Sequence, residues 1–417
     1  MAGTGTERGR VRRPLMPEPL RTVLIAHPGA DLYGSDRVML ETLAGLLERG
    51  VRVVLTAPIG GPLLSAARSL GAETHVVAVP VLRRASMRPR ALARVVTGSV
   101  VAPLRIRALL RQVRPDAVYV STLTIPLWQL VASARLPVIV HVHESERGIS
   151  RLLRTALVLP LLAADRLIVN SRYTFQSLAE VLPSLGRKAT IISNGVPGPR
   201  ALVPARTDLS GGLTIAYVGR LSPRKGVDVA LSALAALRKE GIDATLNVVG
   251  AVFPGYEWYE ARLHDQARRL GISAAVHFHG FLPSVWDALA DSDVVVVPSR
   301  REESFGNSAA EALLAGRPVV ASAIGGLVDV ISGFPSAIPV RPGDPEQLAQ
   351  ALARVASEWD LFRRAAAAAS ESAERRFATA RYRSAVVTEL LALTAGRSAS
   401  AQSAATNGER EGSAAAQ

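Results

Sequence analysis

The feature that most constrains the fold of this chain is a regular alternation of short β-branched runs with longer segments of helical pattern. In the first half, strands are expected at residues 22–27, 51–57, 74–79, 117–121, 138–143, 167–170 and 190–193. In the second half, strands are expected at residues 214–218, 245–249, 276–279, 294–297, 319–322 and 337–340. Apolar strands separated by helices favour parallel sheets that are covered by helices on both faces.

With 417 residues, the chain is too long for one compact domain. The alternation stops once, at a segment rich in proline and glycine that is typical of an interdomain linker. We predict an N-terminal domain at 21–196, a linker at 197–212 and a C-terminal domain at 213–376. The predicted fold class is α/β, with two tandem doubly wound domains. Ligands bind beyond the carboxyl ends of the strands in such sheets, so two facing domains would form an interdomain cleft.

Both ends of the chain differ from this pattern. Residues 1–20 are rich in Gly, Arg and Pro without the apolar run of a secretion signal, and residues 397–417 are rich in Ser, Ala, Gln and Gly. We expect a disordered leader, a disordered tail and a last helix over 377–396. No apolar run is long enough to span a membrane, and the chain has no cysteine, which excludes disulfides and thiolate metal sites. A cytoplasmic protein is therefore expected.

Arginine dominates the formal net charge of +14, because the chain has only the lysines Lys188, Lys225 and Lys239. Nine arginines and no acidic residue lie between Arg83 and Arg114. Such a segment is typical of a surface for nucleic acid or anionic membrane, and equally of a solvated basic helix in an arginine-rich protein.

The densest group of polar residues follows the expected strand at 294–297. The sequence from residue 298 is Pro-Ser-Arg-Arg-Glu-Glu-Ser-Phe-Gly-Asn, and a helical run follows at 308–315. Free backbone N–H groups at a helix start can bind an anion. Glu303 precedes this helix and Glu311 lies inside it, which suits opposite ends of an elongated ligand rather than an acid pair across one bond. The alternative is an ordinary helix-terminal acid and a solvated helix residue.

A second polar loop follows the expected strand at 214–218. Gly219 permits a tight turn there, and Arg220 and Lys225 stand around the loop that leads into the next helix. Two cations near a helix start can neutralise a diphosphate. The loop has neither the Walker pattern nor the dinucleotide-binding fingerprint, which argues against nucleotide hydrolysis and dinucleotide binding.

The paired histidines are candidates for the cleft. His141 and His143 end an expected strand, and we predict that they face opposite sides of it. Only His143, nearer the strand end, is then expected in the cleft. His277 and His279 have no acidic partner at a ligand spacing, so no metal site is expected.

Together, these motifs resemble a known family. The pattern Pro-Ser-x-x-x-Glu-x-Phe-Gly-x-x-x-x-Glu, which contains Glu303 and Glu311, is similar to the signature of the family-four retaining glycosyltransferases. This family, also called group 1, has two Rossmann-like domains (the GT-B fold). Further motifs match in the same order at residues 194–196, 219–226 and 325–326, and the resemblance spans nearly the whole chain from residue 22 to the last helix.

The resemblance implies a role for each matched residue. Arg220 and Lys225 would bind the donor diphosphate and support the charge of the leaving group. Glu303 would accept hydrogen bonds from the donor sugar, and Glu311 would hold the ribose hydroxyls. Replacing Glu303 or Lys225 by Ala is expected to abolish transfer and leave the fold intact, because both should lie in an exposed cleft.

Other matched positions are implied to contact the donor nucleotide, the sugar or the acceptor. His143 is the implied cleft histidine. Gly34 lies where the donor phosphate and the acceptor approach, although many relatives have two adjacent glycines there and this chain has one. Backbone or nearby contacts with the donor are implied for Gly219, Gly280, Phe281, Ser304, Phe305, Gly306 and Asn307.

The activity implied is transfer of a sugar, with retention, from a nucleoside diphosphate sugar to a glycan or lipid-linked acceptor of polysaccharide, glycolipid or cell-envelope glycan biosynthesis. The donor would bind the C-terminal domain, the acceptor the N-terminal domain, and the last helix would pack back on the latter. No metal, other cofactor or nucleic-acid partner is expected, and the Arg83–Arg114 segment is expected to contact the inner face of an anionic membrane. An epimerase or hydrolase on the same fold, or a non-catalytic polyanion-binding protein, are the alternatives. The residues leave front-face attack and a covalent intermediate both open.

Overall fold

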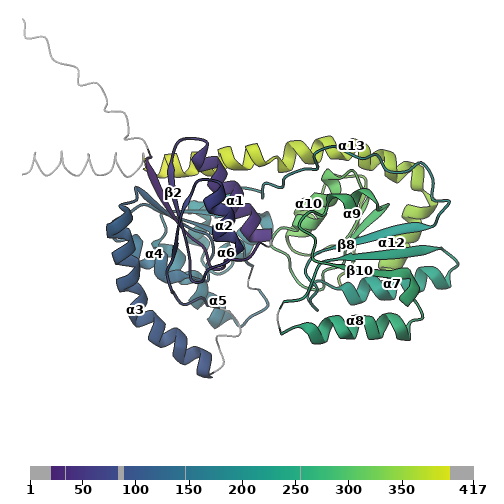
Figure 1. The fold of residues 1–417 in the computed structure, drawn as a ribbon, viewed down its shortest axis with the longest axis horizontal. Coiled ribbons are helices and arrows are strands. Elements are labelled where there is room, and N and C mark those ends of the chain that lie inside the picture. The colour runs from purple at the N-terminus through teal and green to yellow at the C-terminus, as the bar shows by residue number, and fades with distance from the viewer. Residues whose placement is uncertain (1–19, 33, 83–88, 146, 254, 395–417) are drawn as a thin grey trace, which may run out of the picture.

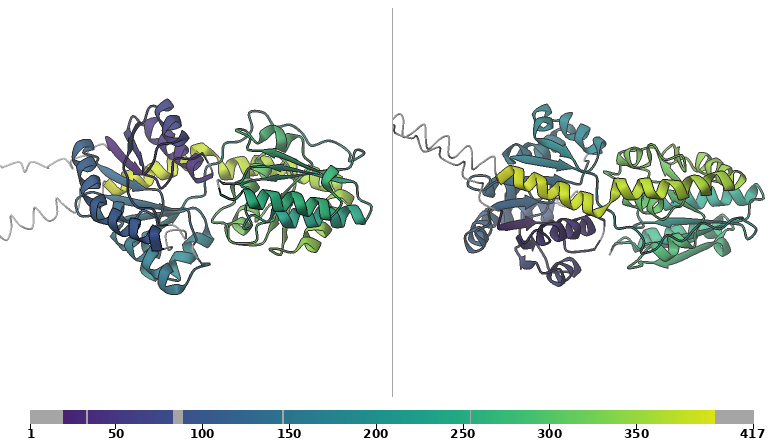
Figure 2. Two further views of the ribbon diagram at one scale, coloured as in Figure 1. Left: turned by 60° about the horizontal axis from the view of Figure 1, so that its bottom comes forward. Right: turned by 90° about the horizontal axis from the view of Figure 1, so that it is seen from above.

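The computed structural model describes residues 20–32, 34–82, 89–145, 147–253 and 255–394. These residues form two α/β halves that lie side by side (Figure 1, Figure 2). The expected disordered tail lies outside the described residues, as does the expected leader apart from Leu20, which is buried.

The N-terminal half is built on a parallel sheet of seven strands in the order β3-β2-β1-β4-β5-β6-β7. In chain order, the strands are β1 (Thr22–Ala26), β2 (Arg52–Ala57), β3 (Glu73–Val76), β4 (Ala117–Val120), β5 (Val138–Val142), β6 (Arg166–Val169) and β7 (Ala189–Ile191). The connecting helices are α1 (Gly34–Leu47), α2 (Pro62–Ser69), α3 (Pro89–Val113), α4 (Pro126–Ala132), α5 (Arg151–Val158) and α6 (Arg172–Ala179), with the 3₁₀ turns η2 (Leu159–Ala163) and η3 (Pro183–Lys188). Strands β4 and β5 are buried throughout, as expected where helices cover both faces of a sheet.

The C-terminal half repeats this plan with six parallel strands in the order β10-β9-β8-β11-β12-β13. The strands are β8 (Leu213–Val218), β9 (Ala244–Val249), β10 (Val276–Gly280), β11 (Val294–Val297), β12 (Val319–Ser322) and β13 (Ala337–Val340). The helices are α7 (Val227–Lys239), α8 (Glu257–Arg269), α9 (Trp286–Ala290), α10 (Asn307–Leu314), α11 (Gly326–Ile331), α12 (Pro345–Ser357) and α13 (Trp359–Phe377), with the 3₁₀ turn η4 (Ser273–Ala275).

In each sheet, the direction of winding reverses beside the first strand, between β1 and β4 and between β8 and β11. A crevice for ligands opens at the carboxyl ends of the strands at such a reversal. The structure therefore confirms the predicted fold class of two tandem, Rossmann-like, doubly wound α/β domains. The positions of the domain and linker boundaries remain predictions.

After α13, the chain crosses from the C-terminal half to the N-terminal half. Helix α13 packs in the C-terminal half, and residues 379–394 then form a helix that runs along the N-terminal half (yellow in Figure 1). Its side chains Tyr382, Val386 and Leu390 are buried in the same apolar cluster as Val23 of β1. The chain also crosses at Val196, whose N–H donates to the Phe377 carbonyl at 2.9 Å.

The arginine-rich segment lies partly on α3. Residues 83–88 are outside the described part of the chain, and the side chains from 83 to 94 are not described. Of the helices that the structure describes, none is both long and apolar enough to cross a membrane.

Candidate active site

A cleft of about 330 Å³ lies between the two halves, at the carboxyl edges of both sheets. It brings most of the predicted site residues together: Gly34, His143, Gly219, Arg220, Lys225, Phe281, Glu303, Ser304, Phe305, Gly306, Asn307 and Glu311 all line it. Gly280 does not line the cleft, and its carbonyl instead accepts a hydrogen bond from the Gly250 N–H at 2.8 Å. The cleft is thus a single site to which both halves contribute.

The cationic loop after β8 is fixed by a buried tyrosine and by glycines. The Tyr217 hydroxyl donates to the Arg220 carbonyl at 2.8 Å, and the Arg220 guanidinium lies 3.4 Å from the centre of the Phe253 ring. Gly226 has a positive φ of 73°, and a Cβ there would lie 1.9 Å from the Pro298 carbonyl oxygen. Only glycine lets this loop pack so closely against the end of β11.

Glu303 is buried, with 7% of its surface exposed, and the expectation that it is exposed is wrong. Its Oε1 accepts hydrogen bonds from Lys225 Nζ at 2.7 Å and Ser299 Oγ at 2.8 Å, and lies 3.1 Å from Arg224 Nη1. Burial alone would raise the pKa of Glu303, but Lys225 and Arg224 outweigh it and lower the pKa to about 2. Glu303 is therefore ionised at neutral pH and can only accept hydrogen bonds.

Sequence reasoning did not find Arg224 or Ser299. Lys225 itself has a lowered pKa, because it is partly buried, although Glu303 opposes the shift. Since three donors share Oε1, the other oxygen of Glu303 remains for a ligand: among the described residues it has no hydrogen-bonding partner.

The paired glycines after β12 support the Glu303 loop. A Cβ on Gly326 would lie 2.1 Å from the Ser304 carbonyl oxygen, and one on Gly325 would lie 2.4 Å from that of Glu303. The Gly326 N–H donates to the Glu303 carbonyl at 2.7 Å. These glycines therefore allow two backbone segments to touch, which fixes the position of the carboxylate.

Helix α10 begins at the floor of the cleft. Gly306 precedes it in the left-handed conformation, and the Phe305 ring is buried edge-on against Phe377, 5.8 Å away. Within the described chain, the backbone N–H groups of residues 304–308 donate to no backbone oxygen. They can serve an anionic ligand, and the helix dipole favours negative charge at this end.

Side-chain amides connect the two halves across the cleft. Asn194 Nδ2 donates to Asn307 Oδ1 at 2.9 Å, and Asn170 Nδ2 donates to Ser304 Oγ at 3.3 Å. A Cβ on Gly34 would lie 2.9 Å from Asn307 Nδ2, so glycine leaves room for this amide. Sequence reasoning assigned no role to Asn170 or Asn194. Both follow strands of a doubly wound sheet, and this position at the carboxyl edge could have indicated that they line the site.

The prediction that His141 and His143 face opposite sides is wrong. Their rings stack with centroids 3.8 Å apart, because side chains two residues apart on a strand point the same way. His143 lines the cleft, and His141 lies beneath it with Nδ1 2.5 Å from the Tyr119 hydroxyl. Burial and the nearby His27 lower the pKa of His143 to about 3, against the opposing Asp36. His143 is therefore neutral at physiological pH.

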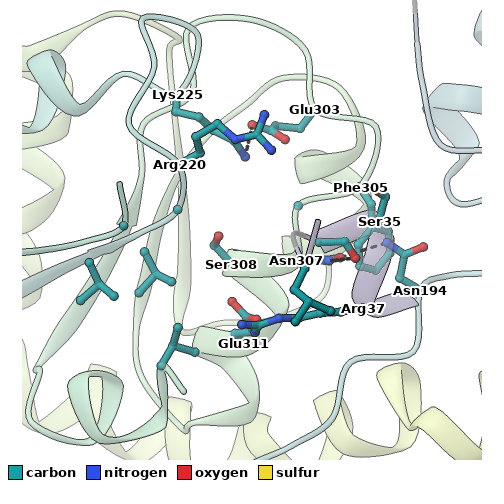
Figure 3. A pocket seen from close by; sticks show the side chains of 18 of the residues that line it. Ser35, Arg37, Asn194, Arg220, Lys225, Glu303, Phe305, Asn307, Ser308 and Glu311 are labelled. Carbon is teal, nitrogen blue, oxygen red and sulfur yellow. Dashed lines mark hydrogen bonds and ion pairs between the residues drawn. The ribbon is translucent and has the colours of Figure 1, made fainter. Parts of the chain in front are cut away.

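The second glutamate lies at the opposite end of the cleft. Figure 3 shows Glu303 beside Arg220 and Lys225, and Glu311 beside Arg37, which sequence reasoning missed. Burial raises the pKa of Glu311 to about 7, although Arg37 and Lys225 oppose this shift. The cleft can thus receive an elongated ligand with negative charge in its middle and hydroxyl groups at both ends. The described residues hold no group of three or more side chains placed to bind a metal.

Comparison with known families agrees with this geometry. Residues 205–372 match the family described as glycosyl transferases group 1, and residues 33–198 match glycosyltransferase family 4. The two matches cover the two halves that form the cleft. The chain belongs to the group 1 glycosyltransferases, with an N-terminal domain of the family-4 type.

Two curated relatives and one solved structure illustrate the similarity. A glycogen synthase of Mycobacterium tuberculosis is 30% identical over 63% of this chain and 65% of its own length. A D-inositol 3-phosphate glycosyltransferase of Saccharomonospora viridis is 35% identical over 51% of this chain and 52% of its own. The chain thus spans less than two thirds of either relative. Anabaena HepE, crystallised with UDP and glucose, has the same fold at a TM-score of 0.75 and 20% identity, over 88% of this chain and 98% of HepE.

Proposed function

We propose that this protein is a retaining glycosyltransferase that moves a sugar from a nucleoside diphosphate sugar to a glycan or lipid-linked acceptor. The observation that carries the proposal is that Arg220, Lys225, Glu303 and Glu311 line one cleft. The family and the relatives named above act on sugars, which supports the same class of reaction here. We further propose that the acceptor belongs to polysaccharide, glycolipid or cell-envelope glycan biosynthesis on the cytoplasmic side of the membrane.

The donor would lie along the cleft with its diphosphate near Arg220, Lys225 and the start of α10. The leaving nucleoside diphosphate gains negative charge as the sugar departs, and fixed positive groups stabilise that charge where it develops. Glu303 is ionised and cannot protonate the leaving group, so its free oxygen would accept hydrogen bonds from sugar hydroxyls. HepE has been crystallised with UDP-glucose, and we propose a UDP-sugar as the first donor to test.

His143 would face the sugar from the acceptor side. Its neutral ring can accept or donate one hydrogen bond, which suits a sugar hydroxyl better than a phosphate. The donor would thus bind mainly the C-terminal half, and the N-terminal half would present the acceptor. No metal or other cofactor enters this proposal.

The test begins with thermal shifts for UDP-, GDP- and ADP-sugars, followed by transfer of labelled sugar to oligosaccharide and lipid-linked acceptors. Lys225→Ala should lower transfer by about 10²–10³-fold, because it removes a cation that stabilises developing charge. Lys239→Ala, at an exposed position on α7, is the matched control and should change nothing. NMR of the anomeric proton in the product would establish retention.

Other outcomes would identify the alternatives. Free labelled sugar as the sole product would indicate a hydrolase, and an altered sugar still attached to the nucleotide would indicate an epimerase. Absence of any donor binding would contradict the proposal.

We also propose that helix α3 docks on an anionic lipid bilayer. Val96, Val100 and Leu104 follow one another at intervals of four residues, share one helix face, and are 57%, 74% and 65% exposed. Arg107 and Arg111 continue this face and are exposed as well. Apolar side chains beside arginines match the acyl boundary and the phosphate groups of an anionic bilayer.

Vesicle sedimentation tests this surface. The protein should pellet with phosphatidylglycerol-containing vesicles and remain in solution with phosphatidylcholine alone. Arg107→Glu with Arg111→Glu should weaken binding by about tenfold or more, at roughly 1 kcal/mol per basic residue. The same changes at Arg262 and Arg269 on α8 are the control. Equal pelleting of the wild type with both lipids, or equal pelleting of the two double variants with the anionic vesicles, would contradict the proposal that this face of α3 binds an anionic bilayer.

A further inference from the structure

We infer that Arg37 prepares Glu311 for the donor: when the two halves are closed, its guanidinium lies at the same end of the cleft, beyond ion-pair distance, and its charge keeps this carboxylate ready to accept the ribose hydroxyls. This inference rests on the proposed function. It concerns a residue of the half that otherwise faces the acceptor, so it connects recognition of the nucleoside to closure of the cleft.

The first support is the position of Arg37. It stands in the first turn of α1 in the N-terminal half, and its Nη2 donates to the Pro283 carbonyl at 3.2 Å, in a loop of the C-terminal half. Glu311 belongs to α10 of the C-terminal half. The two side chains lie at the same end of the cleft only because the halves meet, and Figure 3 shows Arg37 extending toward Glu311 with no ion pair drawn between them.

The second support is that these side chains form a shared wall. A further cavity of about 270 Å³ lies next to the donor cleft, and Arg37, Asn307 and Glu311 line both. Residues 195–197, where the chain crosses between the halves, also line this cavity. A change in the closure of the halves would therefore move Arg37 relative to Glu311.

The third support is electrostatic. Glu311 is partly buried, and this burial raises its pKa to about 7. The charged groups that act on it are Arg37 from α1 and Lys225 from the loop after β8, and both favour the ionised form. Lys225 is already paired with Glu303 at 2.7 Å, so among the described residues that line the cleft, Arg37 is the cation at the Glu311 end. An ionised carboxylate accepts hydrogen bonds from two ribose hydroxyls, whereas a protonated one also presents a donor.

The experiment measures donor affinity between pH 5.5 and 8.5 by calorimetry, with UDP-glucose, GDP-mannose and ADP-glucose as probes. Their diphosphate diesters do not titrate in this range, so a pH dependence reports on the protein. Wild-type affinity should fall as the pH drops through about 7, because Glu311 takes up a proton. Arg37→Ala should weaken binding about tenfold at pH 7 and move the midpoint of this fall upward by about one pH unit.

Conservative variants separate positioning from a merely structural role. Arg37→Lys retains the charge and should restore most of the affinity and the wild-type pH profile. Glu311→Gln should bind weakly at every pH. Arg49→Ala, at an exposed position just beyond the other end of α1, should match the wild type. Thermal unfolding of each variant establishes that the fold is retained.

Two results would overturn the inference while leaving the proposed function standing. In the first, Arg37→Ala has the same donor affinity and pH profile as the wild type. In the second, Arg37→Ala binds donor more weakly with an unchanged pH profile, and Arg37→Lys does not restore the affinity. If the wild type binds none of the three probes, the proposed function fails, and the inference fails with it.

Discussion

The two sides of the cleft are built from different chemistry. On the C-terminal side, Arg224, Lys225 and Glu303 form a contiguous group of charges, held by loops that pack through glycines. On the N-terminal side, His143 is neutral and Asn170 contributes an amide, and Arg37 is a single positive charge at the Glu311 end of the cleft. Under the proposed function, the contiguous charges of the C-terminal side lie where the diphosphate would leave. His143 and Asn170 of the N-terminal side offer neutral hydrogen-bonding groups where sugar hydroxyls would meet.

We expect the largest effect on stability and donor binding from Gly226→Ala, which changes the loop that carries Lys225 on the C-terminal side of the cleft. The new Cβ would meet the Pro298 carbonyl oxygen at 1.9 Å, and the residue would keep a positive φ of 73°. Strain and displacement together should cost about 2–4 kcal/mol of unfolding free energy and abolish donor binding, because Lys225 moves with the loop. Chemical denaturation and calorimetry measure both.

Gly241→Ala is the matched control for this change. Gly241 has a φ of 81° but no atom within 4 Å of its Cβ position, so its replacement carries only backbone strain, about 1–2 kcal/mol. If both variants lose the same unfolding free energy and both bind donor, the close packing of the loop at Gly226 contributes neither to stability nor to donor binding.

We expect an effect of intermediate size when the pH is lowered, because the unfolding free energy then depends on His143, on the N-terminal side of the cleft. Burial, first, and His27 lower the pKa of His143 from 6.5 to about 3, so the unfolded chain takes up a proton between these values that the folded protein does not. The unfolding free energy should therefore fall as the pH drops from about 6.5 toward 3, by about 2 kcal/mol at pH 5 from this residue. Denaturation at pH 7 and pH 5 measures the loss.

His143→Gln should remove this part of the pH dependence, whereas His277→Gln, at an exposed position, should retain it. An identical loss of stability in wild type and His143→Gln would mean that the ring is not held neutral, and that the two sides of the cleft differ less than we describe.

The smallest effect is expected at the amide bridge that joins the two sides. Asn194→Ala removes the 2.9 Å hydrogen bond to Asn307 Oδ1 and should weaken donor binding by about 2–10-fold, as expected for one hydrogen bond. Asn247→Ala removes a hydrogen bond to His279 within the C-terminal half and should leave the donor affinity unchanged. Equal affinities for both variants would show that closure does not depend on this bridge.

Local patterns were sufficient to predict the strands and the position of the signature helix. Strand β11 occupies the predicted residues, and α10 begins at Asn307, one residue before the predicted start. β-Branched runs and glycine stops act over a few residues, so they can be recognised in the sequence.

What could not be predicted depends on contacts between distant segments. The burial of Glu303 requires Arg224 and Lys225, more than 70 positions away in the sequence, to meet it, and the position of Arg37 beside Glu311 requires both halves. The error over His141 and His143 was different in kind. The alternation of side chains along a strand was available from the sequence, and it was applied with the wrong period.

The chain passes between its two halves twice, and the two passages lie against each other. Besides the bond from Val196 to Phe377, a Cβ on Gly195 would lie 2.7 Å from that of Tyr382. Two covalent connections along one edge would limit any opening of the halves to a swing about that edge. Such a swing would bring Asn194 back to Asn307 in the same register. The cleft would then open to exchange ligands and close again on one arrangement.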